Sequence, residues 1–384
     1  MRVLFATGIY PPDVGGPATY VSHLAKELRS RGVGVEVVTY GGSGEEEPGF
    51  PVHRVPRHPF VAHRYLSFYR AALSAARRAD VIYAQDPLSV GLPSLLAGKT
   101  SGRPLVVKIV GDLAWEIAVD LNRTMDSFQD FQRRRQSLPV ELFRRCERFV
   151  ARRAQHVIVP SGYLKEIVLG WGVASERVSV VHNSLPEWEP QKTRVEARQE
   201  LALDGDPLLL MAGRLVRWKR FDLPIRFLAE LPSAHLVIAG SGPLEEQLKT
   251  LARDLGLQGR ITFTGSLHHS AMMLHLRASD LFLLPSTYEG FSHLLLEAMR
   301  MGTPVLASDA GGNAEVVGDA GRLVSAGSPS AFRAALLELC GDPRLREMGE
   351  RARERARRFS WQALVEETLR LLMGAVGARP PTEH

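Results

Sequence analysis

The stretch from Tyr288 to Gly312, YEGFSHLLLEAMRMGTPVLASDAGG, joins a helical pattern to a short apolar strand. Gly290-Phe291-Ser292 precedes an apolar run, and the glycine and proline of MGTP are typical stop signals for a helix. β-rich runs lie on either side, at residues 281–284 and 305–307. This order of strand, helix and strand is typical of a parallel sheet covered by helices.

Two glutamates, Glu289 and Glu297, stand eight positions apart in this stretch. We expect the helix to begin near Glu289, so that the pair spans roughly 12 Å at about 1.5 Å per residue. A glycosidase carboxylate pair needs about 5 to 9.5 Å, so the spacing favours a longer ligand whose phosphates lie over the helix start. Two surface glutamates on an ordinary helix are the alternative, because any Glu-rich helix can produce this spacing.

The same alternation continues along the whole chain and predicts two Rossmann-like α/β domains. Amphipathic segments such as residues 18–31 and 65–78 separate the strands, and the prolines of residues 185–190, LPEWEP, favour a linker there. Ser360 is a candidate N-cap for a last helix that could pack on either domain. The expected strands are residues 3–7, 35–40, 81–85, 105–110 and 156–160, then 208–212, 236–239, 261–264, 281–284 and 305–307.

The composition is that of an ordinary globular protein, with 45% hydrophobic and 23% charged residues among 384. Cys146 and Cys340 are the only cysteines, too few for a disulfide framework or a cysteine-based zinc site, and they favour a reducing compartment. Neither a signal-peptide core nor an apolar run of about 18 residues is present. These features predict a cytoplasmic protein.

A net charge of +6 permits attraction to an anionic partner, and the arginines are concentrated in one stretch. A basic amphipathic helix there would favour peripheral contact with the inner face of the plasma membrane, with solvated arginines on an ordinary helix as the alternative. Nucleic acid is disfavoured, because no nucleic-acid-binding motif accompanies the cluster. The cluster comprises Arg133, Arg134, Arg135, Arg144, Arg145, Arg148, Arg152 and Arg153.

Three segments that follow expected strands carry residues suited to ligand binding. Arg214 and Lys219, in GRLVRWKRFD, offer cations for a diphosphate, although Arg217 and Arg220 flank the same loop. Gly15-Gly16 allows close backbone approach to a phosphate or sugar, or forms a plain turn, and the glycines of residues 239–243 can also shape a turn.

Asp112 follows the expected strand at residues 105–110 and could position or activate an acceptor hydroxyl. Capping of the next helix is the alternative reading of this residue. We predict no metal site, because His268-His269 and His293 lack an H-E-x-x-H arrangement and Glu45-Glu46-Glu47 lies in an expected solvated loop.

Together, Gly15-Gly16, Gly213-Arg214 with Lys219, Glu289 with Glu297, and Gly311-Gly312 with Glu315 resemble the family 4 glycosyltransferases of GT-B fold over nearly the whole chain. The resemblance implies an N-terminal acceptor-binding domain at residues 1–186 and a C-terminal nucleotide-sugar donor-binding domain at 187–359. It further implies parallel sheets facing across a deep cleft, and a final helix at 360–384 that crosses back to the first domain.

The resemblance also implies donor-binding roles for individual residues. Arg214 and Lys219 would bind the donor diphosphate, Glu297 the ribose hydroxyls and Glu289 the transferred sugar. The remaining expected donor contacts are Gly15 and Gly16 near the diphosphate, the backbone of Gly290, Phe291, Ser292 and His293 at the sugar and phosphate, and the main chain around Leu267 at the base.

Two positions depart from the family pattern. Many relatives carry His where this chain has Gly111 followed by Asp112, so Asp112 replaces that His by position only. Asn313-Ala314-Glu315 lacks the Pro that commonly precedes the Glu.

The resemblance implies a retaining, metal-independent glycosyltransferase of hexosyltransferase type, without a cofactor, that uses a UDP- or GDP-linked sugar. Its acceptor would be a glycan or a lipid-linked molecule in cell-envelope polysaccharide or glycolipid synthesis. The alternatives are a GT-B sugar-nucleotide epimerase or phosphorylase, or a non-catalytic nucleotide-sugar binding protein. The sequence does not specify the base, the sugar, the acceptor, the linkage or the oligomeric state.

Overall fold

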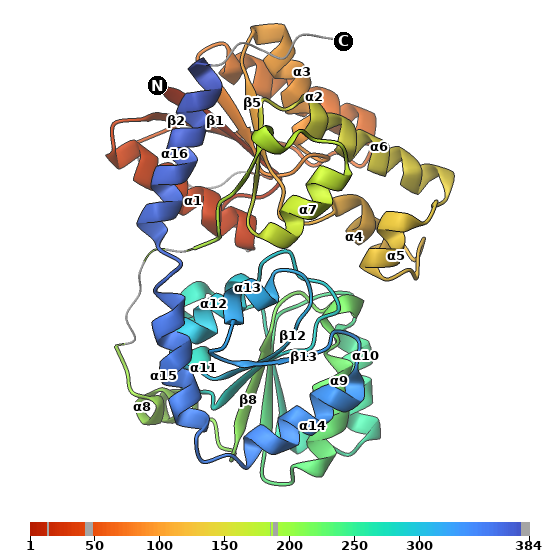
Figure 1. Cartoon of the computed structure of the whole chain (residues 1–384), viewed down its shortest axis with the longest axis vertical. Helices are drawn as coiled ribbons and strands as arrows, with labels where there is room; N and C mark the ends of the chain where they lie inside the picture. The colour runs from red at the N-terminus through yellow and green to blue at the C-terminus, as the bar shows by residue number, and fades with distance from the viewer. Residues whose placement is uncertain (14, 43–48, 185, 187–190, 378–384) are drawn as a thin grey trace. The chain divides into compact units, whose positions relative to one another are not determined.

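The computed structural model describes residues 1–13, 15–42, 49–184, 186 and 191–377, and the chain divides into two compact units (Figure 1). Unit 1 comprises Met1–Pro186 and Ser360–His384, and unit 2 comprises Glu187–Phe359. Each unit holds one parallel sheet covered by helices, which confirms the α/β fold class. Most of the expected linker at 185–190 and the run Glu45-Glu46-Glu47 lie outside the described residues.

The sheet of unit 1 has seven parallel strands in the order β3-β2-β1-β4-β5-β6-β7. Five of them were expected from the sequence, whereas β3 and β7 were not, because these edge strands are short and only partly buried. The strands are β1 (Arg2–Thr7), β2 (Gly34–Tyr40), β3 (Val52–Val55), β4 (Val81–Ala84), β5 (Leu105–Lys108), β6 (His156–Val159) and β7 (Val178–Val180).

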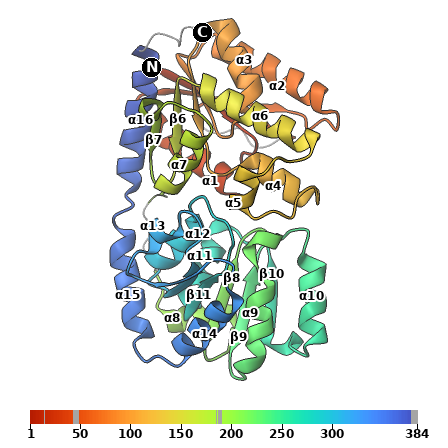
Figure 2. The ribbon, with the colours of Figure 1, turned by 45° about the vertical axis from the view of Figure 1, so that its right-hand side comes forward.

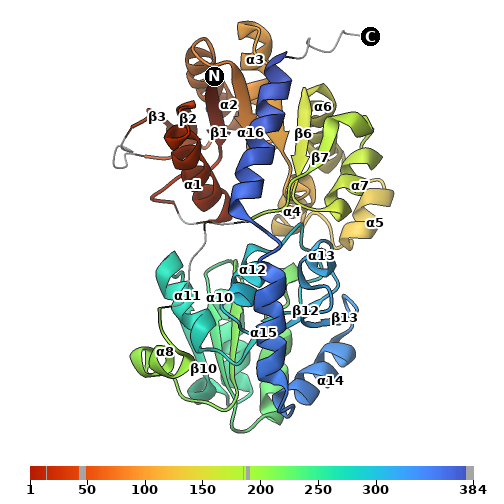
Figure 3. The same cartoon turned by 60° about the vertical axis from the view of Figure 1, so that its left-hand side comes forward.

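Helices cover both faces of this sheet. Along β1, Leu4 and Ala6 face a core shared with α2, α3, α6 and α7, while Val3 and Phe5 face a core shared with α1 and α16 (Figure 3). The helices are α1 (Gly16–Ser30), α2 (Val61–Ala76), α3 (Gly91–Ser101), α4 (Leu113–Asp120), α5 (Phe128–Arg133), α6 (Leu138–Arg153), α7 (Gly162–Gly170) and, after unit 2, α16 (Trp361–Gly377).

The helix α16 closes one face of the unit 1 sheet. Ser360 caps it as expected, since its Oγ accepts a hydrogen bond from the Ala363 amide at 3.3 Å. The helix packs against α1, β4 and β5, and it buries Leu364, Val365 and Leu372 in their shared core. Residues from both ends of the chain therefore build one hydrophobic core.

The sheet of unit 2 has six parallel strands in the order β10-β9-β8-β11-β12-β13 (Figure 2). The strand β13, three residues long, was not expected from the sequence. The strands are β8 (Leu208–Ala212), β9 (His235–Ala239), β10 (Ile261–Gly265), β11 (Leu281–Leu284), β12 (Val305–Ser308) and β13 (Arg322–Val324).

The helices of unit 2 lie on both faces of its sheet. They are α8 (Arg194–Leu201), α9 (Asp222–Phe227), α10 (Glu245–Asp254), α11 (His269–Ala278), α12 (His293–Arg300), α13 (Asn313–Val317), α14 (Pro329–Cys340) and α15 (Leu345–Ala356). Because all strands run parallel, the loops that follow β8, β9, β11 and β12 gather at one edge of the sheet.

Candidate functional site

The candidate site of unit 2 is built at the carboxyl edge of two neighbouring strands. The strand β8 ends at Ala212 and leads into Arg214 and a short 3-10 turn, Arg217–Lys219, while β11 ends at Leu284 and leads into the loop that carries Glu289. These strands pair directly in the sheet, so the two loops lie side by side. The parallel order thus brings together residues that are 70 positions apart.

Lys219 and Glu289 form an ion pair at the centre of this edge. The Lys219 ammonium donates to Glu289 Oε1 at 2.6 Å, and the Ser286 hydroxyl donates to the same oxygen at 2.7 Å. Both residues are mostly buried, so the pair is weakly screened by solvent. Among the described residues, no donor reaches Oε2 of Glu289.

Backbone hydrogen bonds hold the Glu289 loop from both sides. The Thr287 amide donates to the Trp218 carbonyl at 2.7 Å, which fixes the loop to the 3-10 turn of Lys219. The Gly312 amide donates to the Glu289 carbonyl at 3.1 Å, which fixes it to the loop after β12. The carboxylate is therefore positioned by three loops of one sheet edge.

The helix after Glu289 begins later than expected. The helix α12 starts at His293, and Ser292 is its N-cap, with Oγ accepting from the Leu295 amide at 3.3 Å. The expectation of a start near Glu289, and with it the helical span of 12 Å, was wrong because Ser292 caps more strongly than the glycine before it. The helix ends at Arg300, and Gly302 follows with φ of +70°, as its stop signal predicted.

Glu297 lies on α12 and is buried, and this burial raises its pKa to about 8. At neutral pH the carboxyl is mostly protonated and can both donate and accept hydrogen bonds. The His269 ring, at the first position of α11, lies 3.8 Å from Glu297 Oε1 through Nδ1. Sequence reasoning missed this neighbour, since only the folded sheet brings α11 next to α12.

Glycines allow the loops after β8 and β9 to touch through their backbones. Gly213 and Gly240 have φ of +131° and +138°, values that L residues rarely adopt. A Cβ at Gly240 would lie 1.9 Å from the Gly213 carbonyl oxygen. The glycines of residues 239–243 therefore allow the Arg214 loop to pack closely. This agrees with the interpretation that they shape a turn.

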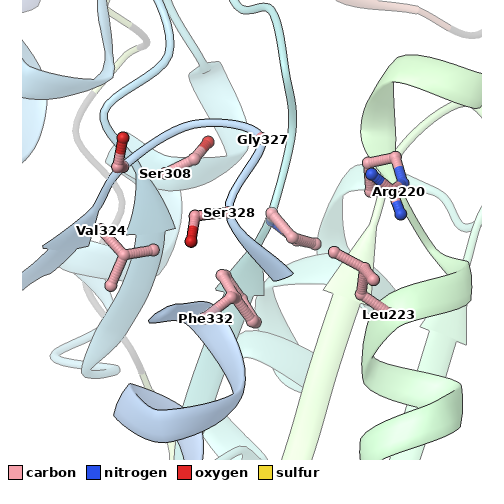
Figure 4. Close-up of a pocket in the computed structure, with 9 residues that line it drawn as sticks. Arg220, Leu223, Ser308, Val324, Gly327, Ser328 and Phe332 are labelled. Carbon is pink, nitrogen blue, oxygen red and sulfur yellow. The ribbon is translucent and has the colours of Figure 1, made fainter. Parts of the chain in front are cut away.

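The cations of the β8 loop separate in the fold. Lys219 turns to Glu289, Arg214 and Arg217 are exposed, and Arg220 pairs with Asp222 through two hydrogen bonds. Arg220 also borders a small pocket between α9, the ends of β12 and β13, and the start of α14, where Leu223, Ser308 and Phe332 form part of the lining (Figure 4). The structure thus distinguishes Lys219 from the flanking cations, which the spacing could not do.

The remaining predicted donor residues of unit 2 occupy loop or helix-start positions. Phe291 is buried and meets Phe359 edge-on at 5.6 Å between ring centroids, so its side chain serves the core. Leu267 is partly buried against the same core in the segment before α11. Gly290 lies in the loop before the Ser292 cap, and His293 is the first residue of α12.

The two glycines predicted to approach a diphosphate lie in unit 1, at the start of α1. Gly15 is the N-cap, Gly16 opens the helix, and a Cβ at Gly15 would lie 2.8 Å from Ile9 Cδ1. The preceding loop is held from the β3 side, where Arg54 donates to the Pro11 carbonyl at 2.7 Å. This anchor was invisible in the sequence, because β3 itself was not predicted.

Asp112 caps α4 in unit 1, which was the alternative interpretation of this residue. Its Oδ1 accepts from the Trp115 amide at 2.8 Å, and its Oδ2 accepts from Gln132 Nε2 at 2.6 Å. Glu147 accepts from the Leu113 and Ala114 amides, so a second carboxylate caps the same helix. Burial raises the pKa of both carboxyls, and proximity of the two raises that of Glu147 further. A catalytic role for Asp112 stays a prediction, and this geometry favours capping.

The arginine-rich stretch forms two helices rather than one, α5 and α6, with residues 134–137 between them. Arg144 is buried, donates to Glu141 at 2.6 Å and to the carbonyls of Arg134 and Gln132, and so fixes the connection between the helices. Its inclusion among the membrane-facing cations was wrong, because its guanidinium serves these internal acceptors. Arg145 is exposed on the outer side of α6.

Over the described ranges, no three His, Cys, Asp or Glu side chains gather as a candidate metal site. In the same part of the chain, every helix is too short or too polar to be a candidate membrane span.

Family models match the two units separately. The model for glycosyl transferases group 1 matches residues 193–359, and the glycosyl transferase 4-like domain matches residues 15–184. An uncharacterized glycosyltransferase of Methanocaldococcus jannaschii is 25% identical, with 96% of this chain and 97% of that protein covered. The D-inositol 3-phosphate glycosyltransferase of Mycobacterium tuberculosis is 33% identical over 56% of this chain and 47% of that protein.

Solved structures share the fold from end to end. HepE from Anabaena, in complex with UDP and glucose, has a TM-score of 0.79 at 23% identity and covers 97% of this chain and 99% of its own. Sucrose-phosphate synthase from Thermosynechococcus elongatus has a TM-score of 0.79 at 21% identity and covers 98% and 99%. With the two consecutive family models, these likenesses show that the chain belongs to the group 1 glycosyltransferases, family 4 enzymes of GT-B fold (EC 2.4).

Proposed function

We propose that this glycosyltransferase moves a hexose from a UDP- or GDP-linked donor to a glycan or lipid-linked acceptor, with retention of configuration and without a metal. The Lys219–Glu289 ion pair, with Oε2 of Glu289 left for a ligand, is the observation that carries this proposal. HepE, whose fold this chain shares, has been solved with UDP-glucose, and this supports a nucleotide-sugar donor.

The donor would rearrange the ion pair as it binds. A diphosphate competes with Glu289 for the Lys219 ammonium, and Arg214 adds a bidentate donor from the same loop. Glu289 then accepts from sugar hydroxyls through Oε2, while Ser286 keeps hold of Oε1. Glu297, mostly protonated at neutral pH, is suited to the ribose hydroxyls because it can donate as well as accept.

The transfer step needs stabilisation of the leaving group more than it needs an enzyme base. The bond between the anomeric carbon and the diphosphate oxygen breaks, and the acceptor oxygen bonds to the same face of that carbon. The acceptor proton passes to the leaving diphosphate. Lys219 and Arg214 stabilise the negative charge that develops on the leaving diphosphate. In other enzymes a metal ion has this role.

We further propose that the enzyme acts in the cytoplasm, at the inner face of the plasma membrane. Its acceptor would belong to cell-envelope polysaccharide or glycolipid synthesis. Cys146 and Cys340 are both free thiols, which agrees with a reducing compartment. Exposed arginines of the stretch between Arg133 and Arg153 would give peripheral contact with anionic lipid.

The decisive experiment combines donor screening with an assay of turnover. Thermal-shift measurements with UDP-, GDP- and ADP-sugars identify the donor by ligand linkage, and release of free nucleotide is then measured with and without candidate acceptors. We expect release that depends on the acceptor and that falls strongly in Lys219→Met. Arg217→Met, in the same 3-10 turn but exposed, is the matched control and should keep its turnover.

Other outcomes identify the alternatives. Nucleotide release that requires inorganic phosphate would indicate a phosphorylase, and sugar-nucleotide interconversion without an acceptor would indicate an epimerase. Donor binding without any turnover across the acceptors tested would favour a binding protein. Each of these results would overturn the proposed transfer reaction.

A further inference from the structure

A second group of cations lies at the amino edge of the unit 2 sheet, away from the loops of Lys219 and Glu289. The side chains come from α8, α11 and α15, which cover one face of that sheet together with α12 (Figure 1). Asp280, directly before β11, marks this edge, and it accepts from the Leu208 amide at the start of β8 at 2.8 Å. The donor loops follow the other ends of these two strands, roughly 13 to 17 Å away at about 3.3 Å per residue.

Two arginines of α8 pair with Asp280. Arg194 donates to its Oδ1 at 3.1 Å, and Arg198 donates to its Oδ2. Arg198 also donates through Nε to the Ala278 carbonyl at 2.8 Å. The two guanidinium groups thus share one carboxylate, and their side chains are only 24% and 27% exposed, so solvent screens their charges incompletely.

Two further arginines approach from the other helices. Arg277, in the last turn of α11, donates to the carbonyls of Lys192 and Met301, both at 3.0 Å. Arg346, in the first turn of α15, is exposed and makes no hydrogen bond or ion pair with the described residues. Three helices therefore bring positive charge to the same edge.

The amino-edge cluster comprises Arg194, Arg198, Arg277 and Arg346. Among the described residues, Asp280 is the only carboxylate that pairs with a member of this cluster. Burial lowers the pKa of Arg194, and the positive charges of the other three arginines lower it further, against the opposing effect of Asp280. Guanidinium groups held beside a single carboxylate repel one another, and a bound anion would relieve that repulsion.

Helix capping explains only part of this arrangement. Arg198 and Arg277 donate to carbonyls at the ends of α11 and α12, which is a common role for arginine. Capping does not explain Arg346, which has no partner within the described ranges. In the same ranges, Nη1 of Arg198 and Nη2 of Arg277 have no acceptor either. The cluster thus holds guanidinium donors beyond those that its helices need.

We propose that the amino-edge cluster binds a small phosphorylated molecule, at a site separate from the donor loops. Guanidinium forks bind phosphate oxygens in pairs, and four arginines against Asp280 suit a ligand with two or more negative charges. A compact ligand is favoured over a macromolecule, because the side chains of Arg194 and Arg198 are about three-quarters covered.

The helices of the cluster also carry part of the donor site. The helix α11 begins at His269, beside Glu297, and has Arg277 in its last turn. The helix α12 carries Glu297, and Arg277 binds the Met301 carbonyl directly after its end. A ligand at the cluster would therefore stabilise the far ends of the helices that position Glu297. Phosphate binding there requires neither the transfer reaction nor a particular donor.

Calorimetric titration of the full chain with inorganic pyrophosphate tests the proposal. The titrated chain carries Arg214→Met and Lys219→Met, which remove the diphosphate cations of the donor loops. We expect it to bind pyrophosphate with a Kd below about 1 mM, and inorganic phosphate more weakly because that ion carries less charge.

The cluster variant adds Arg194→Gln and Arg346→Gln to this chain. Pyrophosphate affinity should fall by about tenfold or more, because two guanidinium groups are lost. Asp280 keeps its hydrogen bonds from Arg198 and from the Leu208 amide, so we expect the fold to be retained. Arg346→Gln alone removes no hydrogen bond among the described residues and should weaken binding by about threefold or more. This single variant keeps the test valid if the cluster variant is unstable.

A matched control removes two cations from the same part of the chain. Arg351 and Arg358 are exposed, and Arg351 lies about 140° around α15 from Arg346. Arg351→Gln with Arg358→Gln changes the net charge as much as the cluster variant does. It should leave pyrophosphate affinity within about twofold of that of the titrated chain.

Three results would overturn the proposal. The chain without the donor cations could fail to bind pyrophosphate, or the cluster and control variants could lose the same affinity. Alternatively, poly-aspartate or RNA could bind at the cluster while pyrophosphate does not, which would assign it to a macromolecule. Pyrophosphate binding that is lost only when the cluster arginines are replaced supports the proposal. A failure of the proposed transfer reaction would appear in the turnover assay and leave this titration unchanged.

Discussion

Two sheet edges in this molecule carry a buried acidic side chain after a parallel strand, and they use it differently. After β11, one oxygen of Glu289 accepts hydrogen bonds from Lys219 and Ser286, and no donor among the described residues reaches the other. After β5, Asp112 uses one oxygen to cap α4 and the other to bind Gln132. Glu289 and Asp112 both lie at the carboxyl edge of a sheet, but their oxygens differ in their hydrogen-bond partners.

An edge carboxylate becomes a candidate ligand group when a cation offsets its burial and one of its oxygens has no internal donor. Asp112 lies beside a second carboxylate, Glu147, and burial raises the pKa of both. A capping pair of this kind stabilises structure, because its acceptors are occupied by backbone amides and by the Gln132 side chain.

Loss of the Glu289 carboxylate should have the largest effect. Glu289→Gln keeps the shape but removes the charge that holds Lys219, so we expect acceptor-dependent nucleotide release to fall by about 100-fold in kcat/KM. Glu230→Gln removes an exposed ion pair of the same unit and serves as the control. A kcat/KM of Glu289→Gln within threefold of that of the original chain would show that the carboxylates at the two edges do not differ in function.

A change at Glu297 should appear in the pH dependence of stability. The folded pKa of about 8 exceeds the ordinary 4.5, so between these values the folded state keeps a proton that the unfolded chain loses, and stability falls as pH rises. Below pH 4.5 the group contributes nothing. Glu297→Gln should remove this loss, on the order of 2 to 4 kcal/mol by pH 8.5.

Urea unfolding at pH 5 and pH 8.5 measures the Glu297 effect as a difference between variant and original chain. The advantage of Glu297→Gln should grow with pH across this window. An advantage that is equal at both values would mean that the carboxyl titrates normally in the folded state.

Substitution of Asp112 tests the other edge. Asp112→Ala removes the α4 cap and leaves Gln132 without its acceptor, so we expect a loss of about 2 kcal/mol in unfolding free energy. Asp112→Asn can still cap and should lose less. Turnover of the folded Asp112→Asn variant should stay within about threefold, whereas a loss near 100-fold would assign Asp112 to the reaction after all.

The smallest effect is expected at the helix start after Glu289. Ser292→Ala removes the hydroxyl that accepts from the Leu295 amide, which should cost about 1 kcal/mol of stability. Ser270→Ala, at an exposed position of α11, is the control and should lie within about 0.5 kcal/mol of the original chain. Equal midpoints in chemical unfolding for both variants would show that the cap is not needed.

The sequence predicts the sheets well where strands are central and apolar. Residues 208–212 and 281–284 are continuous apolar runs, and both form buried strands with those bounds. The edge strands β3, β7 and β13 escaped prediction because each is short and only partly buried, so the hydrophobic pattern that marks a strand is weak.

The candidate site was predictable in its residue types but not in its pairings. Four cations lie within seven positions of the β8 loop, and only the fold turns Lys219 to Glu289 and Arg220 to Asp222. The start of α12 was misplaced because Ser292 caps the helix, so Glu289 stays in the loop before it. His269 near Glu297 and Arg54 near Pro11 depend on tertiary contacts that spacing does not encode.

The helix α16 constrains the order in which the molecule can be completed during synthesis. Unit 2 has all its residues once Phe359 has been added, whereas the core between α1 and the first sheet still lacks Leu364, Val365 and Leu372. Until those residues leave the ribosome, the part of this sheet face that α16 covers stays open to solvent, while α1 covers another part. The second half of the chain can therefore finish folding before the first, which reverses the usual order of domain folding on the ribosome.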